Sequence, residues 1–308
     1  MTPEQLAPVW VSTVAAATPL IYAGLGELVT EKAGVLNLGV EGMMLIGAVV
    51  GFATTLSTGN ATLGFLAAMG ASMLLSLLFG FLTLTLQTNQ VATGLALTLF
   101  GMGLSAFIGR DYVGTPIMGL QPLPIPLLAD LPIVGAFLFR FDVMVYLSVL
   151  LFAIIYWFLN RSYGGLLTKA IGESPAAAHA LGRPVIGIRY LAVLFGGAMS
   201  GLGGAYLSTV LTPMWVEGMV AGRGWIALAL VVFATWKPSR VLLGAYLFGG
   251  VTVLQLHAQG FGFSIPSEFL SMLPYAATIV VLVLICRSPT TILLNQPASL
   301  GRPFHPDA

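Results

Sequence analysis

The sequence predicts an all-α integral membrane protein with about nine transmembrane helices, some of them broken or re-entrant. Hydrophobic residues make up 57% of the 308 residues and charged residues only 7%. The mean hydropathy of +0.96 excludes an ordinary soluble domain. No Asp, Glu, Lys or Arg occurs between Gly42 and Gly109. Apolar stretches recur along the chain at close to the 20 or so residues that a helix needs to cross a bilayer.

Nine apolar stretches are predicted to form the spans, within a single membrane domain that covers residues 1–308. The second and the eighth are short, and breaks within helices would change the count. The predicted spans are 7–29, 41–56, 63–86, 91–109, 142–159, 188–211, 220–236, 241–256 and 269–286. In the sixth, the sequence GGAMSGLGG places small residues on one face, which favours close packing of helices, first of all within the chain.

The distribution of Lys and Arg predicts the orientation, because basic residues concentrate in cytoplasmic loops. With the loop 161–189 in the cytoplasm, nine basic residues lie inside and three lie outside. This arrangement places the N-terminus outside and the C-terminus inside. A re-entrant segment at 34–43 would reorganise the first helices. The outside residues are Arg110, Arg140 and Arg223.

Residues 110–141 are predicted to be an external loop, because prolines at high density disfavour a long straight helix. The loop separates two halves that each contain a glycine-interrupted apolar segment, NLGVEG in the first and AGRGW in the second. Matching interruptions of this kind indicate two loosely related halves. The prolines of the loop are Pro116, Pro122, Pro124, Pro126 and Pro132.

Glu27, Asn37 and Glu41 are the first candidates for a substrate pathway, because ionisable groups at membrane depth are costly and are usually functional. The glycines between them indicate an interrupted helix, and transporters build sites at such breaks. On a continuous helix, Asn37 and Glu41 would share a face. A structural alternative is that Glu41 neutralises the N-terminus of a half-helix.

The segment EKAGVLNLGVEGMMLIGA resembles the first-helix region of bacterial ABC-importer permeases for nucleosides, which are relatives of the ribose and branched-chain amino acid permeases. NQVATGLALTLFGMGLSAF, beginning at Asn89, and EGMVAGRGWIALALVVFATWKP, beginning at Glu217, resemble the same family. With GESPAAAHALG, the resemblance runs from about residue 19 to about residue 250. Four matches in the same order make this a specific signal.

Two further polar sites have both a functional and a structural interpretation. Asn89 and Gln90 belong to an uncharged polar island that a cytoplasmic turn explains. The resemblance instead implies that these amides line a cavity, where they suit the edges of nucleobases. Arg223 and Trp225 either line the outer mouth of the pathway or anchor the helix at the membrane interface.

The loop 161–187 is predicted to be cytoplasmic, and its residues Ala177, Ala178 and Gly182 resemble the AAxxxG core of a helix that couples such permeases to their ATPases. The acid that usually leads this core is absent at Ala176, and Glu173 stands three residues earlier. The resemblance therefore implies that Glu173, Ala177, Ala178 and Gly182 contact an ATPase. An ordinary amphipathic helix on the membrane surface is the alternative.

Local start and stop signals predict a short helix in this loop. Ser174 is a good N-cap, Pro175 suits the first helical position, and the alanines that follow are strong helix formers. Gly182 is suited to end the helix, and Pro184 prevents its continuation.

The sequence does not contain the residue patterns of an enzyme. No GxxxxGK[ST] motif is present, and the three histidines, His179, His257 and His305, lack metal-ligand spacing. We find no catalytic constellation and expect no cofactor or metal in this chain. The net charge of +1, without a basic block, predicts no nucleic-acid partner.

The resemblance implies the permease subunit of an ATP-driven ABC importer that translocates nucleosides across the bacterial cytoplasmic (inner) membrane. Its implied partners are a second homologous permease, two ATPase subunits that bind the ATP, an extracytoplasmic solute-binding protein and membrane lipids. Ribose-like simple sugars are the alternative substrates. A secondary transporter coupled through Glu27 and Glu41 is the alternative mechanism, but such a carrier does not need the coupling loop.

Overall fold

A computed structural model of the chain describes residues 3–123, 134–260 and 295–305, with isolated positions between 269 and 283. In this part of the chain the regular structure is helical, accompanied by two isolated β-bridges that join Val113 to Trp215 and Pro116 to Met214. The α-helices are α1 (Pro3–Lys32), α2 (Val40–Thr58), α3 (Ala61–Gly80), α4 (Gln90–Gly109), α5 (Val134–Leu138), α6 (Val143–Arg161), α7 (Tyr163–Glu173), α8 (Pro175–Ala180), α9 (Val185–Tyr206), α10 (Arg223–Phe233) and α11 (Pro238–Gly260).

Six helices in the described residues are long and apolar enough to cross a membrane. They correspond to the first six predicted spans, and π-helical turns at Phe81–Thr85 and Leu207–Leu211 extend α3 and α9. Six apolar helices of this length indicate a multi-pass membrane protein. The six are Ala7–Lys32, Val40–Thr58, Ala61–Thr85, Gln90–Tyr112, Val143–Arg161 and Val185–Leu211.

The predicted count of about nine spans is not confirmed. The seventh predicted span becomes the short helix α10. The eighth lies within α11, which has 23 residues but is not among the six apolar helices. The ninth, 269–286, falls largely outside the described residues.

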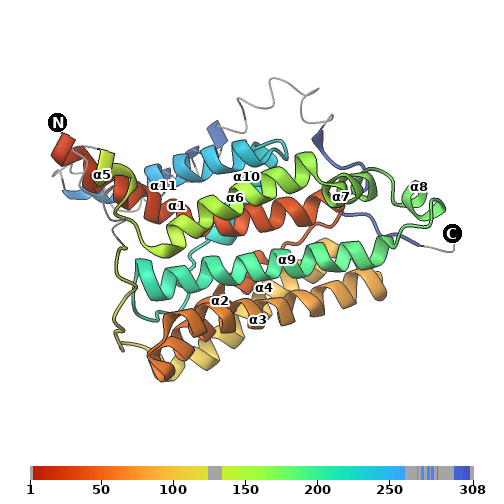
Figure 1. The fold of residues 1–308 in the computed structure, drawn as a ribbon. Helices are drawn as coiled ribbons and strands as arrows, with labels where there is room; N and C mark the ends of the chain where they lie inside the picture. The colour runs from red at the N-terminus through yellow and green to blue at the C-terminus, as the bar shows by residue number, and fades with distance from the viewer. Residues whose placement is uncertain are drawn as a thin grey trace.

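The centre of the molecule is formed by α1, α2 and α9, which pack against one another through small residues. Figure 1 shows α3 and α4 on one side of α9, and α6, α10 and α11 on the other. Gly47 of α2 lies so close to α9 that a Cβ there would stand 2.6 Å from the Cα of Gly201. The glycines of GGAMSGLGG are buried within the chain, as the sequence predicted.

The second half of the chain contains an irregular segment where the sequence AGRGW predicted a break. Residues 212–222 form no regular helix, and buried Trp215 packs against Gly109 at the end of α4. Ala221 and Gly222 adopt positive φ angles of 49° and 82°. Helix α10 then begins at Arg223 and has 11 residues, about half the length that a span requires.

The two predicted loops lie toward opposite ends of the helices. The described part of 110–141 contains the short helix α5, near the N-terminus, while α7 and α8 lie near the C-terminus at the other end (Figure 1). Pro124, Pro126 and Pro132 lie outside the described residues.

Candidate functional site

Glu27 and Asn37 are brought together by the turn between α1 and α2. The helix α1 ends at Lys32, Gly34 takes a left-handed φ of 85°, and the chain returns alongside α1. The Glu27 carboxylate accepts a 3.1 Å hydrogen bond from the backbone N–H of Asn37. Asn37 Oδ1 accepts a 2.9 Å hydrogen bond from the N–H of Gly39, one residue before α2. Both side chains are buried, with exposed fractions of 1% and 0%.

The expectation that Asn37 and Glu41 share a helix face is wrong, because Asn37 lies in the turn and only Glu41 belongs to α2. The side-chain oxygen of Asn37 satisfies one backbone N–H of that turn, and its amide nitrogen donates a 3.5 Å hydrogen bond to the sulfur of Met43. Such local hydrogen bonds compete with helix formation. Asn37 therefore shapes the connection between the two helices.

Glu41 links α2 to the start of α10. Its two carboxylate oxygens accept hydrogen bonds from the backbone N–H groups of Gly222, at 2.8 Å, and Gly224, at 2.7 Å. These N–H groups belong to the first turn of α10, where they lack partners within the helix. A carboxylate is favoured there by the helix dipole as well. The sequence left open that Glu41 neutralises the N-terminus of a half-helix. In the structure, that half-helix is α10.

Glu31 is a further buried acid, which the sequence reasoning did not select as a site. Its carboxylate accepts a hydrogen bond from the indole N–H of Trp236, which follows α10. Glu31 and Glu27 lie four residues apart on α1, so they are one helical turn from each other. The carboxylates of α1 and α2 thus contact the segments at both ends of α10. The sequence did contain a signal for Glu31, because this acid stands one helical turn from Glu27.

Gln90 reaches the same region, and Asn89 does not. Gln90 is 3% exposed, and its side-chain oxygen accepts a 2.8 Å hydrogen bond from the N–H of Leu36. Asn89 is exposed and caps α4 by accepting a 3.0 Å hydrogen bond from the N–H of Ala92. One amide of the polar island therefore holds the α1–α2 turn, and the other has a capping role.

Arg223 and Trp225 lie on the first turn of α10, next to Glu41. The Arg223 guanidinium donates hydrogen bonds to the carbonyls of Met219, at 3.1 Å, and Val220, at 3.0 Å. Trp225 is half-buried and packs against an apolar cluster that includes Val40 and Met44 of α2.

Within the described part of the chain, several polar atoms in this region are buried without a hydrogen-bond partner. They are Glu27 Oε2, Glu31 Oε1 and Gln90 Nε2. Unpartnered buried polar atoms are uncommon in native proteins and call for an explanation. They distinguish this polar centre, formed by Glu27, Glu31, Asn37, Glu41 and Gln90, from the apolar helices around it.

The short helix predicted in the loop 161–187 is present as α8. Ser174 caps it by accepting a 3.3 Å hydrogen bond from the N–H of Ala177, and Pro175 occupies its first turn. Gly182 takes a φ of 71° just beyond its end. Glu173 and Ala177 are exposed, whereas Ala178 is 6% exposed. The helix α7, which precedes α8, was not predicted as a separate element.

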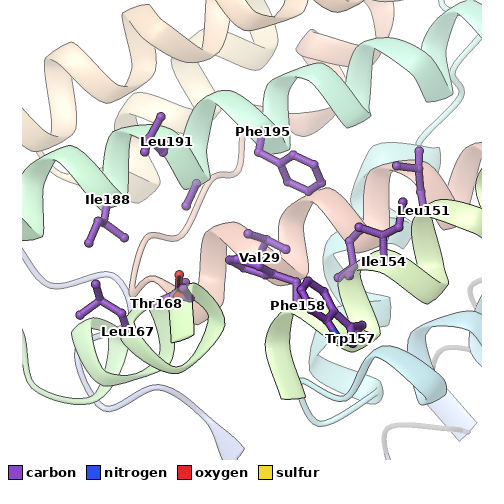
Figure 2. A pocket seen from close by; sticks show the side chains of 13 residues that line it. Val29, Leu151, Ile154, Trp157, Phe158, Leu167, Thr168, Ile188, Leu191 and Phe195 are labelled. Carbon is purple, nitrogen blue, oxygen red and sulfur yellow. Dashed lines mark hydrogen bonds between the residues drawn. The ribbon is translucent and has the colours of Figure 1, made fainter. Parts of the chain in front are cut away.

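A cavity of about 500 Å³ lies between α1, α6, α7 and α9. Figure 2 shows Val29, Phe158 and Phe195 among the side chains that line it. Its walls are almost entirely apolar, and none of the predicted pathway residues is among them. An apolar cavity on membrane helices is suited to hydrocarbon and does not favour a polar solute.

The family model described as "Branched-chain amino acid transport system / permease component" matches residues 10–284. The chain belongs to this family of permeases. The permease is 43% identical to "Putative glucose ABC transporter permease protein TsgC13" of Haloferax volcanii, over 96% of this chain and 96% of the relative. It is 33% identical to guanosine ABC transporter permease protein NupQ of Bacillus subtilis, over 88% of this chain and 89% of the relative.

Nucleoside ABC transporter permease protein NupC of Lactococcus lactis is 32% identical over 87% of the permease and 89% of its own length. No solved structure matches the permease. The family consists of membrane subunits of ABC transporters, which are not themselves catalytic. Accordingly, the permease is the membrane component of an ABC transporter, which implies ATPase and solute-binding partners in general terms.

Proposed function

We propose that this permease imports a neutral, hydroxylated solute, with nucleosides as the first candidate. The polar centre carries the proposal, since four of the predicted pathway residues, Glu27, Asn37, Glu41 and Gln90, lie in this buried polar region. Glu41 of the polar centre is engaged by the N-terminal turn of α10, and neighbouring Arg223 by two carbonyls. Among the described residues, Glu27 and Glu31 each keep one buried carboxylate oxygen without a hydrogen-bond partner. These two oxygens are free acceptors and the Nε2 of Gln90 is a free donor, a combination that suits the hydroxyl groups of a neutral solute.

Two candidate solutes share the hydroxylated ring that such a site would bind. The relatives NupQ and NupC, named for guanosine and nucleosides, favour a nucleoside. The Haloferax relative, named for glucose and more similar in sequence, favours a simple sugar. A nucleoside adds a base with donors and acceptors that the amide of Gln90 would suit.

We further propose that ATP hydrolysis in a partner drives transport through α8. The short helix is capped at its start, is followed by Gly182 and is exposed at Ala177, and Glu173 at the end of α7 is exposed beside it, as a docking element requires. The end of the molecule that contains α8 also contains Lys32, Lys169 and Lys237, which supports a cytoplasmic location for it and an external location for 110–141. No cofactor is required in the permease itself.

The experiment that tests the proposal uses tagged permease extracted from its native membrane in mild detergent. We expect an ATPase to copurify and its hydrolysis to rise when a solute-binding protein loaded with guanosine is added. Stimulation by the glucose-loaded protein, and not by the guanosine-loaded one, would replace the nucleoside with a sugar. Isolation of a homogeneous permease without an ATPase would leave Glu27 and Glu41 as ion-coupling groups of a secondary carrier.

A further inference from the structure

All three lysines of the chain line one cavity. Lys32, Lys169 and Lys237 are the only lysines in the 308 residues, and each contributes to a cavity of about 290 Å³. They come from three separate elements: the end of α1, the middle of α7 and the turn between α10 and α11. We call this cavity the lysine pocket. Its other lining residues are Tyr156, Leu159, Asn160, Trp236, Pro238, Ser239 and Asn295.

The three lysines that line the pocket differ in how far they are buried. Lys32 is half-buried, and its ammonium donates a 2.9 Å hydrogen bond to the backbone carbonyl of Asn295. An ammonium has three hydrogens, so two remain for a ligand. Lys169 is half-buried on α7, and Lys237 is exposed at the mouth. Asn160 and Ser239 add neutral polar groups to the wall.

Among the described residues, those that line the pocket include no acid. Glu31 and Glu173 act electrostatically on Lys32, but neither lines the pocket. The carboxylate of Glu31 is held by the indole of Trp236. Lys169 and Lys237 act on Lys32 with like charge, so an anion in the pocket would relieve their mutual repulsion.

The composition of the pocket indicates the chemistry of that anion. A phosphate group offers more strong acceptor oxygens than a carboxylate, and so can accept hydrogen bonds from several ammonium groups at once. The other walls include Leu159, Pro238 and the ring of Trp236, so a ligand with a phosphate and an apolar part matches both surfaces. Basic pockets between membrane helices bind anionic lipid head groups in this manner.

We propose that the lysine pocket binds a phosphate-bearing anion at the end of the helical bundle that contains α8. A phospholipid head group and a soluble phosphate share this chemistry. The proposal goes beyond solute transport, because the pocket contains none of the residues of the polar centre.

The test is a titration of the purified full-length permease with phosphatidylglycerol and, separately, with phosphatidylcholine, followed by native mass spectrometry and thermal unfolding. Wild-type permease is expected to bind phosphatidylglycerol in preference. Lys169→Gln combined with Lys237→Gln is expected to weaken that binding roughly 30-fold, at the usual contribution of a lysine near an anionic lipid. The matched control, Arg110→Gln with Arg161→Gln, removes the same charge from exposed positions outside the pocket and is expected to change it little.

Two further measurements identify the source of the phosphate and guard against misfolding. Inorganic phosphate that raises thermal stability in a lysine-dependent way, without selective lipid binding, would assign the site to a soluble ligand. Lys169→Arg with Lys237→Arg keeps the charge and is expected to retain binding within about threefold, because arginine also binds phosphate.

Equal binding by wild-type permease and the glutamine variant, for lipid and inorganic phosphate alike, would overturn the proposal. Loss of ATPase copurification in that variant, with phosphate and lipid binding unchanged, would overturn it too. The lysines would then form a protein interface.

Discussion

Glu41 on α2 accepts a 2.7 Å hydrogen bond from the backbone N–H of Gly224 on α10, across 183 residues of sequence. The other oxygen of the same carboxylate accepts from Gly222. The carboxylate thus accepts hydrogen bonds from N–H groups that have no partner within the helix, at the start of the half-length helix α10. It also fixes α10 against the polar turn that contains Asn37, which lies close to Glu27. Motion of either helix would therefore disturb both the contact and the polar centre.

The close approach at Gly224 predicts that Gly224→Ala destabilises the permease. A Cβ at this position would lie 2.6 Å from the backbone N and Cα of Glu41, and backbone atoms cannot yield as a side chain does. We expect a loss of about 1–3 kcal/mol in stability, the usual effect of overpacking. Gly103→Ala in α4 is the control, because a Cβ there would meet nothing within 4 Å. Thermal unfolding in detergent measures both; equal melting temperatures would contradict the prediction.

Glu41→Gln tests the capping bond and the pathway role together. Glutamine has one acceptor oxygen, so one of the two N–H groups of α10 loses its partner, at about 1–3 kcal/mol if it stays buried. We expect weaker solute uptake with near-normal expression. Glu217→Gln is the control, since Glu217 is exposed in the segment before α10. Wild-type uptake together with reduced thermal stability would give Glu41 a structural role only.

The sequence predicted the local features of this fold better than its long-range contacts. The first six spans and the break before α10 follow from apolar length and from glycine. The start and end of α8 follow from Ser174, Pro175 and Gly182, whose effects are confined to a few residues. The count of spans was not predictable in this way, because half-helices such as α10 have the composition of spans and differ only in tertiary position.

The candidate site was predicted only in part, for a physical reason. A charged residue within an apolar stretch is unusual, and this feature identified Glu27 and Glu41 as candidate pathway residues. The group that each carboxylate meets depends on how distant segments pack. Contacts such as that of Glu41 with Gly224, or of Glu31 with Trp236, leave no local pattern in the sequence.

The exposed surface formed by Glu173, at the end of α7, and Ala177, on α8, predicts how substitutions there affect binding of the ATPase. Glu173 and Ala177 both face outward, so Glu173→Lys combined with Ala177→Arg adds bulk and positive charge without disturbing the fold. We expect the ATPase to be lost from the purified complex, while the variant permease elutes from size exclusion as a folded protein. Asp111→Lys, at the other end of α4 from Asn89, is the exposed control. Copurification at wild-type levels with the double variant would remove the docking role from this face of α8.

Buried Arg189 joins three segments near α8. It is 1% exposed, and its guanidinium donates hydrogen bonds to the carbonyl of Ala33, at 3.1 Å, and to the hydroxyl oxygen of Ser299, at 3.0 Å. Ser299 in turn donates a 2.7 Å hydrogen bond to the carbonyl of Gly172, near the end of α7. The end of α1, the start of α9 and residues 295–305 are thus held together next to α8.

This network predicts that Arg189→Leu loosens the C-terminal segment from α7. The substitution keeps an apolar stem but leaves the acceptors at Ala33 and Ser299 without their donor, at about 1–3 kcal/mol for each that stays buried. We expect faster limited proteolysis within 295–305 and weaker ATPase copurification, because α7 leads directly into α8. Arg161→Leu removes an exposed arginine and is the control. Unchanged proteolysis with normal copurification would show that the segment is held without Arg189, by contacts such as its backbone hydrogen bonds to Gly34 and Gly172.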